Sequence, residues 1–308
     1  MATETSLFNS FHNENAPPGL PSSDEVLAAL DPTSPRGWFA YPSPDAPTCW
    51  VKHGFTVDWN EVVSQHLANT WLAQTQSVVR APTVYFAFQH DSTLSRPTTV
   101  IVMEYIPGKT LEQLWEDADE AEQETYRHRV ADAFMALSRI PVDPSKRSPS
   151  AVDGSHIKHQ MFDDRVAPRL YENVQQLQDH LNLLSKRLRG NTPCNMAEEP
   201  LVYCFSDLHM SNFMIDEDGR MAVVDFAHTS FVPASMALFP ARTNRLYFDI
   251  SALVDIPGAN PAQVVPLGDI AYRLDISGMG LARLNREIDG GDNETQKRLG
   301  SRVITKVG

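Results

Sequence analysis

The residues best suited to chemistry lie in a short polar loop followed by a hairpin. Asp207 and Asn212 are five residues apart in the segment Phe-Ser-Asp-Leu-His-Met-Ser-Asn, residues 205–212. Two apolar runs around an Asp-Gly turn signal predict a hairpin over residues 213–226, which would return Asp225 beside Asn212. A carboxylate can orient a hydroxyl group, and amide and carboxylate oxygens are ligands for Mg²⁺. This pattern therefore indicates phosphoryl transfer, with Asp207 as the catalytic carboxylate and Asn212 and Asp225 as metal ligands.

A kinase-like hinge is predicted upstream of this loop. Residues 98–102 form a β-branched run that predicts a buried strand, and Pro107-Gly108 ends it. Thr110 and Gln113 have the spacing of a capping box that opens a helix. A strand, a break and a helix in this order are typical of the segment that receives the adenine ring in kinases. The backbone expected to receive it here belongs to Glu104, Tyr105 and Ile106.

Two charged residues nearer the N-terminus complete the pattern. Lys52 ends a short apolar run, and Glu61 lies near the start of a helix predicted over residues 59–74. In kinases, a lysine on a strand, held by a glutamate from a helix, positions the α and β phosphates of the nucleotide. Each residue also has an ordinary alternative. Lys52 could be a solubility residue on an edge strand, and Glu61 could be the partner of Asp58 in a capping box.

The loop residues have ordinary alternatives as well. Asp207 and Asn212 are common turn formers, and Asp225 could cap the end of a strand. Along the chain the motifs follow the order lysine, glutamate, hinge, Asp-x4-Asn and Asp. This order, more than any single residue, favours the kinase-like interpretation.

On these motifs the chain resembles the aminoglycoside phosphotransferase and choline kinase-like superfamily, in a divergent branch known from fungi, over residues 48–239. The resemblance implies ATP and Mg as cofactors. It also implies an α+β, two-lobed protein-kinase-like fold with an abbreviated small β lobe and a mainly helical large lobe. The family's catalytic loop usually reads His-Gly-Asp-Leu-His-x-x-Asn, so Phe205 and Ser206 depart from it. Its metal-binding Asp is commonly followed by Phe or Trp and then Glu, a position that Ala227 occupies here.

We expect three segments along the chain. Residues 1–24 are polar and proline-containing and predict a loosely ordered N-terminal segment, residues 25–106 a small lobe and residues 107–308 a large helical lobe. Apolar residues at helical spacing predict two helices in the large lobe, over residues 120–140 and 174–188.

Two regions depart from the family pattern. Residues 30–50 contain five prolines and a single glycine, Gly37, so we expect neither a glycine-rich loop nor an ordinary strand pair there. Residues 249–308 look irregular, with glycine interruptions and a basic tail, and the resemblance fades after residue 239.

Composition limits the classes of partner. The chain of 308 residues has 26 Lys and Arg against 39 Asp and Glu, a formal charge of −13, which argues against nucleic acid as a partner. No run is long enough to cross a bilayer, and the N-terminus lacks the features of a secretory signal, so we expect a cytoplasmic protein with no membrane partner. The acidic run over residues 116–124 could attract a cationic amine or amino sugar, although such runs more often begin a solvated helix.

Two functions fit the sequence. The leading hypothesis is an ATP- and Mg-dependent phosphotransferase that acts on a hydroxyl group of a small molecule, because Lys52, Asp207, Asn212 and Asp225 are all retained. The alternative is a catalytically silent pseudokinase that serves as a binding or regulatory module, favoured by Phe205 and the missing glycine-rich loop. A protein kinase is disfavoured, because no activation segment ending in Ala-Pro-Glu is present. The sequence carries no signal for the acceptor or for an oligomeric state.

Overall fold

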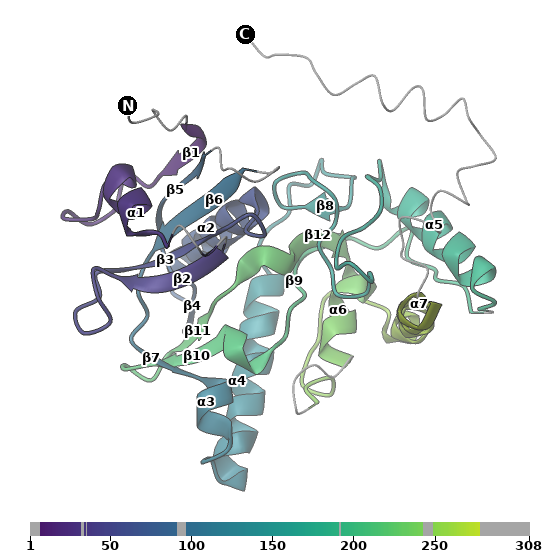
Figure 1. The fold of residues 1–308 in the computed structure, drawn as a ribbon. Helices are drawn as coiled ribbons and strands as arrows, with labels where there is room; N and C mark the ends of the chain where they lie inside the picture. The colour runs from purple at the N-terminus through teal and green to yellow at the C-terminus, as the bar shows by residue number, and fades with distance from the viewer. Residues whose placement is uncertain are drawn as a thin grey trace.

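The chain folds into a small lobe built on a five-stranded sheet and a larger, mainly helical body (Figure 1). This is a computed structural model, and it describes residues 7–31, 34, 36–90, 97–190, 192–242 and 249–277. The architecture confirms the predicted α+β, kinase-like fold class. Among the described residues, no helix is both long and apolar enough to cross a membrane.

The small lobe holds an antiparallel sheet with the strand order β1-β5-β6-β3-β2. Its elements are β1 (Leu7–His12), α1 (Ser23–Ala29), β2 (Arg36–Tyr41), β3 (Cys49–Gly54), β5 (Val84–His90) and β6 (Thr98–Met103). Side chains of a strand alternate between the two faces of its sheet. Val100 and Val102 of β6 therefore pack with Val26 of α1 on one face, whereas Ile101 packs with Val62 of the next helix on the other. Both faces of β6 are buried, as its β-branched sequence predicts.

The strand pair thought unlikely in the proline-rich region is present, so that prediction is wrong. β2 pairs with β3 from Arg36 opposite Gly54 to Tyr41 opposite Cys49. Pairing is possible because Pro42, Pro44 and Pro47 all fall in the connection between the strands, where no ladder N–H group is needed. The small lobe is therefore more complete than the abbreviated lobe that the sequence suggested, although the connection still contains no glycine.

The N-terminal segment also differs from expectation. Residues 7–12 lie within the segment expected to be loosely ordered, yet they form β1 and pair with β5. β5 would otherwise be an edge strand with unpaired backbone groups, and β1 satisfies them. The division of the chain into lobes at residues 25–106 and 107–308 stays a prediction.

Helix α2 (Trp59–Gln74) connects the small lobe to the body, and its bounds are those predicted. The predicted capping box of Thr110 and Gln113 opens α3 (Leu111–Trp115). The two predicted large-lobe helices are present as α4 (Glu120–Ser138) and α5 (Val174–Arg187). The acidic run lies at the start of α4, where Asp119 and Glu122 form a capping box. The run therefore starts a helix, which is the more ordinary of its two predicted roles.

Two further sheets surround the polar loop. One has the order β4-β11-β10-β7 and is centred on the predicted hairpin, and the other has the order β8-β12-β9. Their strands are β4 (Val79–Arg80), β7 (Gly108–Thr110), β8 (Ser150–Ala151), β9 (Leu201–Phe205), β10 (Phe213–Asp216), β11 (Met221–Val223) and β12 (Thr229–Pro233). Short 3₁₀ turns, η1 (Met210–Asn212) and η2 (Phe226–His228), flank the hairpin. The hairpin is thus held on both sides by strands that lie before it in the chain.

The C-terminal part of the described chain is irregular over residues 249–260, as expected, but it then forms a helix that was not predicted. α6 (Ala234–Arg242) packs against α7 (Val264–Ser277), which lies within the segment expected to be irregular. The buried side chains of α7 include Leu267, Ile270 and Leu274, which share one face of the helix. The expectation of an irregular segment is therefore wrong over residues 264–277, where the sequence carries this apolar spacing. Residues 278–308, with the basic tail, lie outside the described residues.

Candidate active site

Three residues from different elements meet at one point. Lys52 lies on β3, and its Nζ is 2.6 Å from Oε1 of Glu61 and 3.1 Å from Oδ1 of Asp225. Glu61 lies in the first turn of α2, and Asp225 follows β11, 173 residues after Lys52. Both ordinary alternatives are wrong. β3 lies between β6 and β2 rather than at an edge, and Asp58 makes no capping hydrogen bond through its side chain.

Burial and charge act together on this ion pair. The side chain of Glu61 is 1% exposed, and burial raises its pKa to about 7 even though the ammonium of Lys52 favours the ionised form. Burial alone would lower the pKa of Lys52, but the carboxylates of Glu61 and Asp225 outweigh it and raise that pKa. Lys52 therefore stays cationic at neutral pH. Removing one partner of a buried ion pair leaves the other charge buried without compensation, which is strongly destabilising. The positions of these three charged groups therefore depend on one another.

The polar loop between β9 and β10 brings Asp207 and Asn212 together. The side-chain amide of Asn212 donates to the backbone carbonyl of Asp207 at 3.0 Å. The backbone N–H of Val224 donates to the carbonyl of Asn212 at 2.9 Å, so the hairpin returns Asp225 next to Asn212 as predicted. Asp225 has φ 63° and ψ 72°, a left-handed conformation that is uncommon outside glycine. Such backbone strain is concentrated at functional sites.

The carboxylate of Asp207 has two basic neighbours that the sequence did not reveal. Its Oδ2 is 3.4 Å from Nδ1 of His228 and 3.8 Å from Nη1 of Arg165. Ser206, which replaces the family's glycine, donates from its N–H and its hydroxyl to the carbonyl of His228, at 3.0 and 2.9 Å. His228 could have been suspected from its place three residues after Asp225. Arg165 carries no sequence signal, because it lies in an irregular segment far upstream of the loop.

Phe205 occupies the position where the family usually has a histidine, and it packs in an aromatic cluster. Its ring is 5.3 Å from that of Phe226 and 6.2 Å from that of Phe213, at interplanar angles of 65° and 77°. All three rings are fully buried, and edge-to-face packing of this kind is favourable. The loop is thus braced by apolar packing where the family commonly has a polar group.

The segment predicted as the hinge lies between β6 and β7, and the N–H group and side chain of Glu104 already have partners within the protein. The backbone N–H of Glu104 donates to the carbonyl of Thr83 at 2.8 Å. Its side chain turns toward Arg80, with which it forms an ion pair, and Arg80 also lies 3.2 Å from Oδ2 of Asp216. Of the predicted adenine contacts, the carbonyl of Glu104 and the backbone of Tyr105 and Ile106 remain for a base.

The family profile of the phosphotransferase enzyme family matches residues 61–241, which is more than half of the chain. The chain belongs to this family. The predicted resemblance, placed at residues 48–239, is therefore confirmed. No curated protein matches the sequence significantly.

Solved structures of aminoglycoside phosphotransferases are similar to the chain at low identity. A thermostable mutant of aminoglycoside phosphotransferase APH(4)-Ia, in ternary complex with ADP and hygromycin B, has 13% identity and a TM-score of 0.47, with 90% of this chain and 94% of that chain covered. The GDP and kanamycin complex of APH(2")-IIia has 11% identity and a TM-score of 0.42, with 89% and 93% covered.

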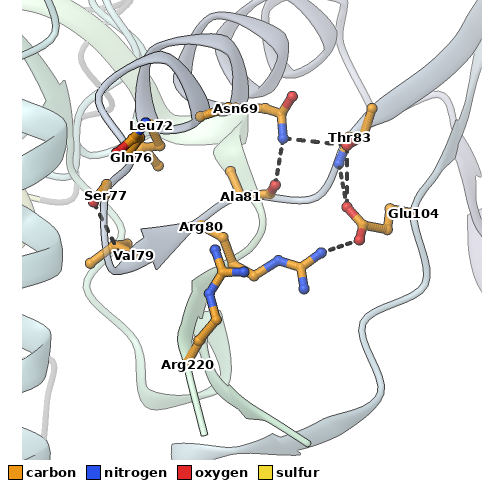
Figure 2. A pocket seen from close by; sticks show the side chains of 11 residues that line it. Asn69, Leu72, Gln76, Ser77, Val79, Arg80, Ala81, Thr83, Glu104 and Arg220 are labelled. Carbon is orange, nitrogen blue, oxygen red and sulfur yellow. Dashed lines mark hydrogen bonds and ion pairs between the residues drawn. The ribbon is translucent and has the colours of Figure 1, made fainter. Parts of the chain in front are cut away.

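A cavity of about 310 Å³ lies beside the hinge residue Glu104 (Figure 2). The carboxylate of Glu104 reaches it, and in Figure 2 Arg80 extends from β4 toward that carboxylate, with Arg220 beside it. The lining residues are Asn69, Leu72, Ala73, Gln76, Ser77, Val79, Arg80, Ala81, Thr83, Glu104 and Arg220. None of these belongs to the cluster of Lys52, so this cavity is separate from the predicted phosphate site.

Proposed function

We propose that this phosphotransferase transfers the γ-phosphoryl group of ATP to a hydroxyl group of a small molecule. The observation that supports the proposal most directly is the meeting of Lys52, Glu61 and Asp225. These residues are distant in sequence. Lys52 with Glu61 is predicted to position the phosphates, and Asp225 is predicted to hold the metal. A silent pseudokinase is less favoured, because the residues proposed for catalysis are all present. Lys52 forms ion pairs with Glu61 and Asp225, the polar loop is intact, and Asp225 has a strained backbone.

In this proposal each polar residue has one task. Lys52, held by Glu61, binds the α and β phosphates. Asp207 orients the acceptor hydroxyl and receives its proton. As the acceptor oxygen forms a bond to the γ phosphorus, the bond from that phosphorus to the bridging oxygen breaks, and ADP leaves with the electron pair. The products are ADP and a phosphate ester.

The donor set near the phosphates suits Mg²⁺. The Asp225 side chain is 42% exposed, and the Asn212 amide nitrogen is fixed by its bond to Asp207. The Asn212 side-chain oxygen accepts a long hydrogen bond of 3.4 Å from the Ser211 hydroxyl, which leaves a lone pair for a metal ion. Within the described part of the chain, no three His, Cys, Asp or Glu side chains form a complete metal site. This fits a cation held by one carboxylate, one amide and nucleotide phosphates. When bound, Mg²⁺ would neutralise charge on those phosphates.

The proposal names the acceptor by its chemical class and the location by its compartment. The acceptor is a small molecule with a hydroxyl group, and family membership does not fix it, because one fold serves many substrates. Tyr105 and Ile106 of the hinge are proposed to receive the adenine ring. The acidic charge of −13 supports a protein that does not bind nucleic acid, and the expected location is the cytoplasm.

Nucleotide binding is the first test. Calorimetry with ATP, with and without Mg²⁺, should show Mg-dependent binding by the wild type. Lys52→Met and Asp225→Ala should each weaken binding about tenfold or more, because the first removes the cation that binds the phosphates and the second removes a carboxylate ligand of the Mg²⁺ that accompanies them. Lys186→Met is the matched control, since Lys186 is exposed on α5. The absence of Mg-dependent binding by the wild type would refute the proposal.

Turnover separates the enzyme from the pseudokinase. A metabolite screen for ATP-dependent phosphate addition should yield a phosphorylated product with the wild type. Asp207→Asn should bind nucleotide normally and lose transfer, because only the proton acceptor is removed. A wild type that binds MgATP but forms no ADP, even with water as acceptor, would support the pseudokinase instead.

A further inference from the structure

A guanidinium group is held beside the proposed catalytic carboxylate by a segment to which no function has been given. Nη1 of Arg165 lies 3.8 Å from Oδ2 of Asp207, and the side chain of Arg165 is 43% exposed. Arg165 has φ 55°, a left-handed backbone conformation that costs a side-chain-bearing residue free energy. The chain thus adopts an unfavoured conformation at the residue that meets Asp207, which is a common mark of a functional position.

The segment that carries Arg165 is well anchored. The N–H of Arg165 donates to the carbonyl of Phe162 at 2.8 Å, and its carbonyl accepts from the N–H of His159 at 2.9 Å. Ile157 and Phe162 are buried in the large-lobe core. The loop over residues 157–167 is closed by a hydrogen bond from the N–H of Ala167 to the carbonyl of Ile157, at 2.8 Å. The backbone of Arg165 is therefore fixed, while its side chain is partly exposed.

Phosphoryl transfer requires a positive group beside the transferred phosphoryl group. In phosphoryl transfer, negative charge is spread over the oxygens of the transferred group, and a positive group beside them stabilises the transition state. The catalytic loop over residues 205–212 contains no Lys or Arg. Lys52 is held by Glu61 and Asp225, and its proposed partners are the α and β phosphates rather than the transferred group. The imidazole of His228 is charged only when protonated, whereas a guanidinium is always charged.

We propose that Arg165 is a catalytic residue, whose guanidinium binds the phosphoryl group as it passes from ATP to the acceptor. Asp207 contacts the acceptor oxygen, and that oxygen bonds to the phosphorus, so a group within 3.8 Å of Asp207 can reach the phosphoryl oxygens. Two N–H groups of a guanidinium match two phosphoryl oxygens. The inference rests on the proposed function and adds a residue that the family motif does not contain.

The test variant is Arg165→Asn. Asparagine tolerates the left-handed backbone better than arginine, so the substitution removes the cation without disturbing the loop. The matched control is Arg189→Asn. Arg189 is also an arginine in the left-handed conformation, with φ 61°, and it follows shortly after α5. Helix α5 and strand β3 lie on opposite sides of the molecule (Figure 1). Thermal melting should show that both variants are at least as stable as the wild type.

Two readouts need no knowledge of the acceptor. Single-turnover hydrolysis of MgATP, with water as acceptor, should fall about 100-fold in Arg165→Asn, the size seen when one donor to transition-state charge is removed. Aluminium fluoride mimics the transferred group, and it should raise the affinity of the wild type for MgADP but not that of Arg165→Asn. The affinity for MgADP alone should be unchanged. Arg165→Lys should recover part of both effects, because the charge is kept and the fork is lost.

The outcomes separate this inference from the function on which it rests. Wild-type hydrolysis and a wild-type response to aluminium fluoride in Arg165→Asn would overturn the catalytic role. Loss of stability or of MgADP affinity in this variant would also overturn it, by showing a structural role. A wild type that binds no MgADP would instead remove the proposed function, and the inference with it. If hydrolysis is too slow to measure, the response to aluminium fluoride decides.

Discussion

Asn60 offers the sharpest test of how the small lobe is fixed to the body. It precedes Glu61 on α2, is fully buried, and has hydrogen bonds on both ends of its amide. Nδ2 donates to the carbonyl of Thr229 at 2.9 Å, and Oδ1 accepts from the N–H of Val152 at 2.8 Å. A weaker bond of 3.4 Å reaches the carbonyl of Ala227, just after Asp225. One side chain thus connects the helix of Glu61 to the segment that carries Asp225.

The substitution Asn60→Ala should lower the free energy of unfolding by about 3 kcal/mol. Two good hydrogen bonds are lost at about 1 kcal/mol each, and the buried groups left without partners and the small cavity add about another 1 kcal/mol. Asn69→Ala on the same helix is the control. Asn69 is only part-buried and has a single short bond, from Nδ2 to the carbonyl of Ala81 at 2.9 Å, so its loss should cost about 1 kcal/mol. The gain in helix propensity from Asn to Ala is common to both variants.

Urea unfolding of the two variants measures the difference. The expected gap of about 2 kcal/mol corresponds to about a 30-fold difference in the unfolding equilibrium. Calorimetry should also show weaker MgATP binding by Asn60→Ala than by Asn69→Ala, because Glu61 and Asp225 lose their common support. Equal stability of the two variants would refute the reasoning, since it would mean that the buried amide does not hold α2 in place.

Two further predictions concern single residues of the hinge and the loop. Gly108→Ala should destabilise the protein by about 3 kcal/mol, because Gly108 has φ 154° and a Cβ there would clash with the carbonyl of Ile215 and lie 2.8 Å from Cα of Asp216. Gly219→Ala, with φ 76° but open space around the added Cβ, should cost about 1 kcal/mol, and equal thermal shifts for the two would contradict this account. Phe205→Ala should cost about 4 kcal/mol in urea unfolding, because it empties a fully buried aromatic site, and a cost below 1 kcal/mol would show that the aromatic cluster does not brace the loop.

Local features of the chain were predictable because they are encoded within a few residues. The helix over residues 59–74, the capping box at Thr110 and the hairpin that returns Asp225 follow from spacing, side-chain caps and turn residues. Helix α7, which was not predicted, has the same kind of signal in its apolar stripe. The meeting of Lys52 with Asp225 was predicted in a different way, from the order of motifs that the chain shares with its family.

Only the tertiary structure decided which distant segments lie together. The proline content of residues 30–50 argued against β2, but the prolines between β2 and β3 lie outside the hydrogen-bonded ladder of these strands. The polar N-terminal segment gave no sign that β1 would pair with β5. Arg165 meets Asp207, and Glu104 turns its side chain toward Arg80, through packing that no local pattern records. A sequence determines backbone preferences over a turn or two, whereas contacts between segments depend on the free energy of the whole packed arrangement.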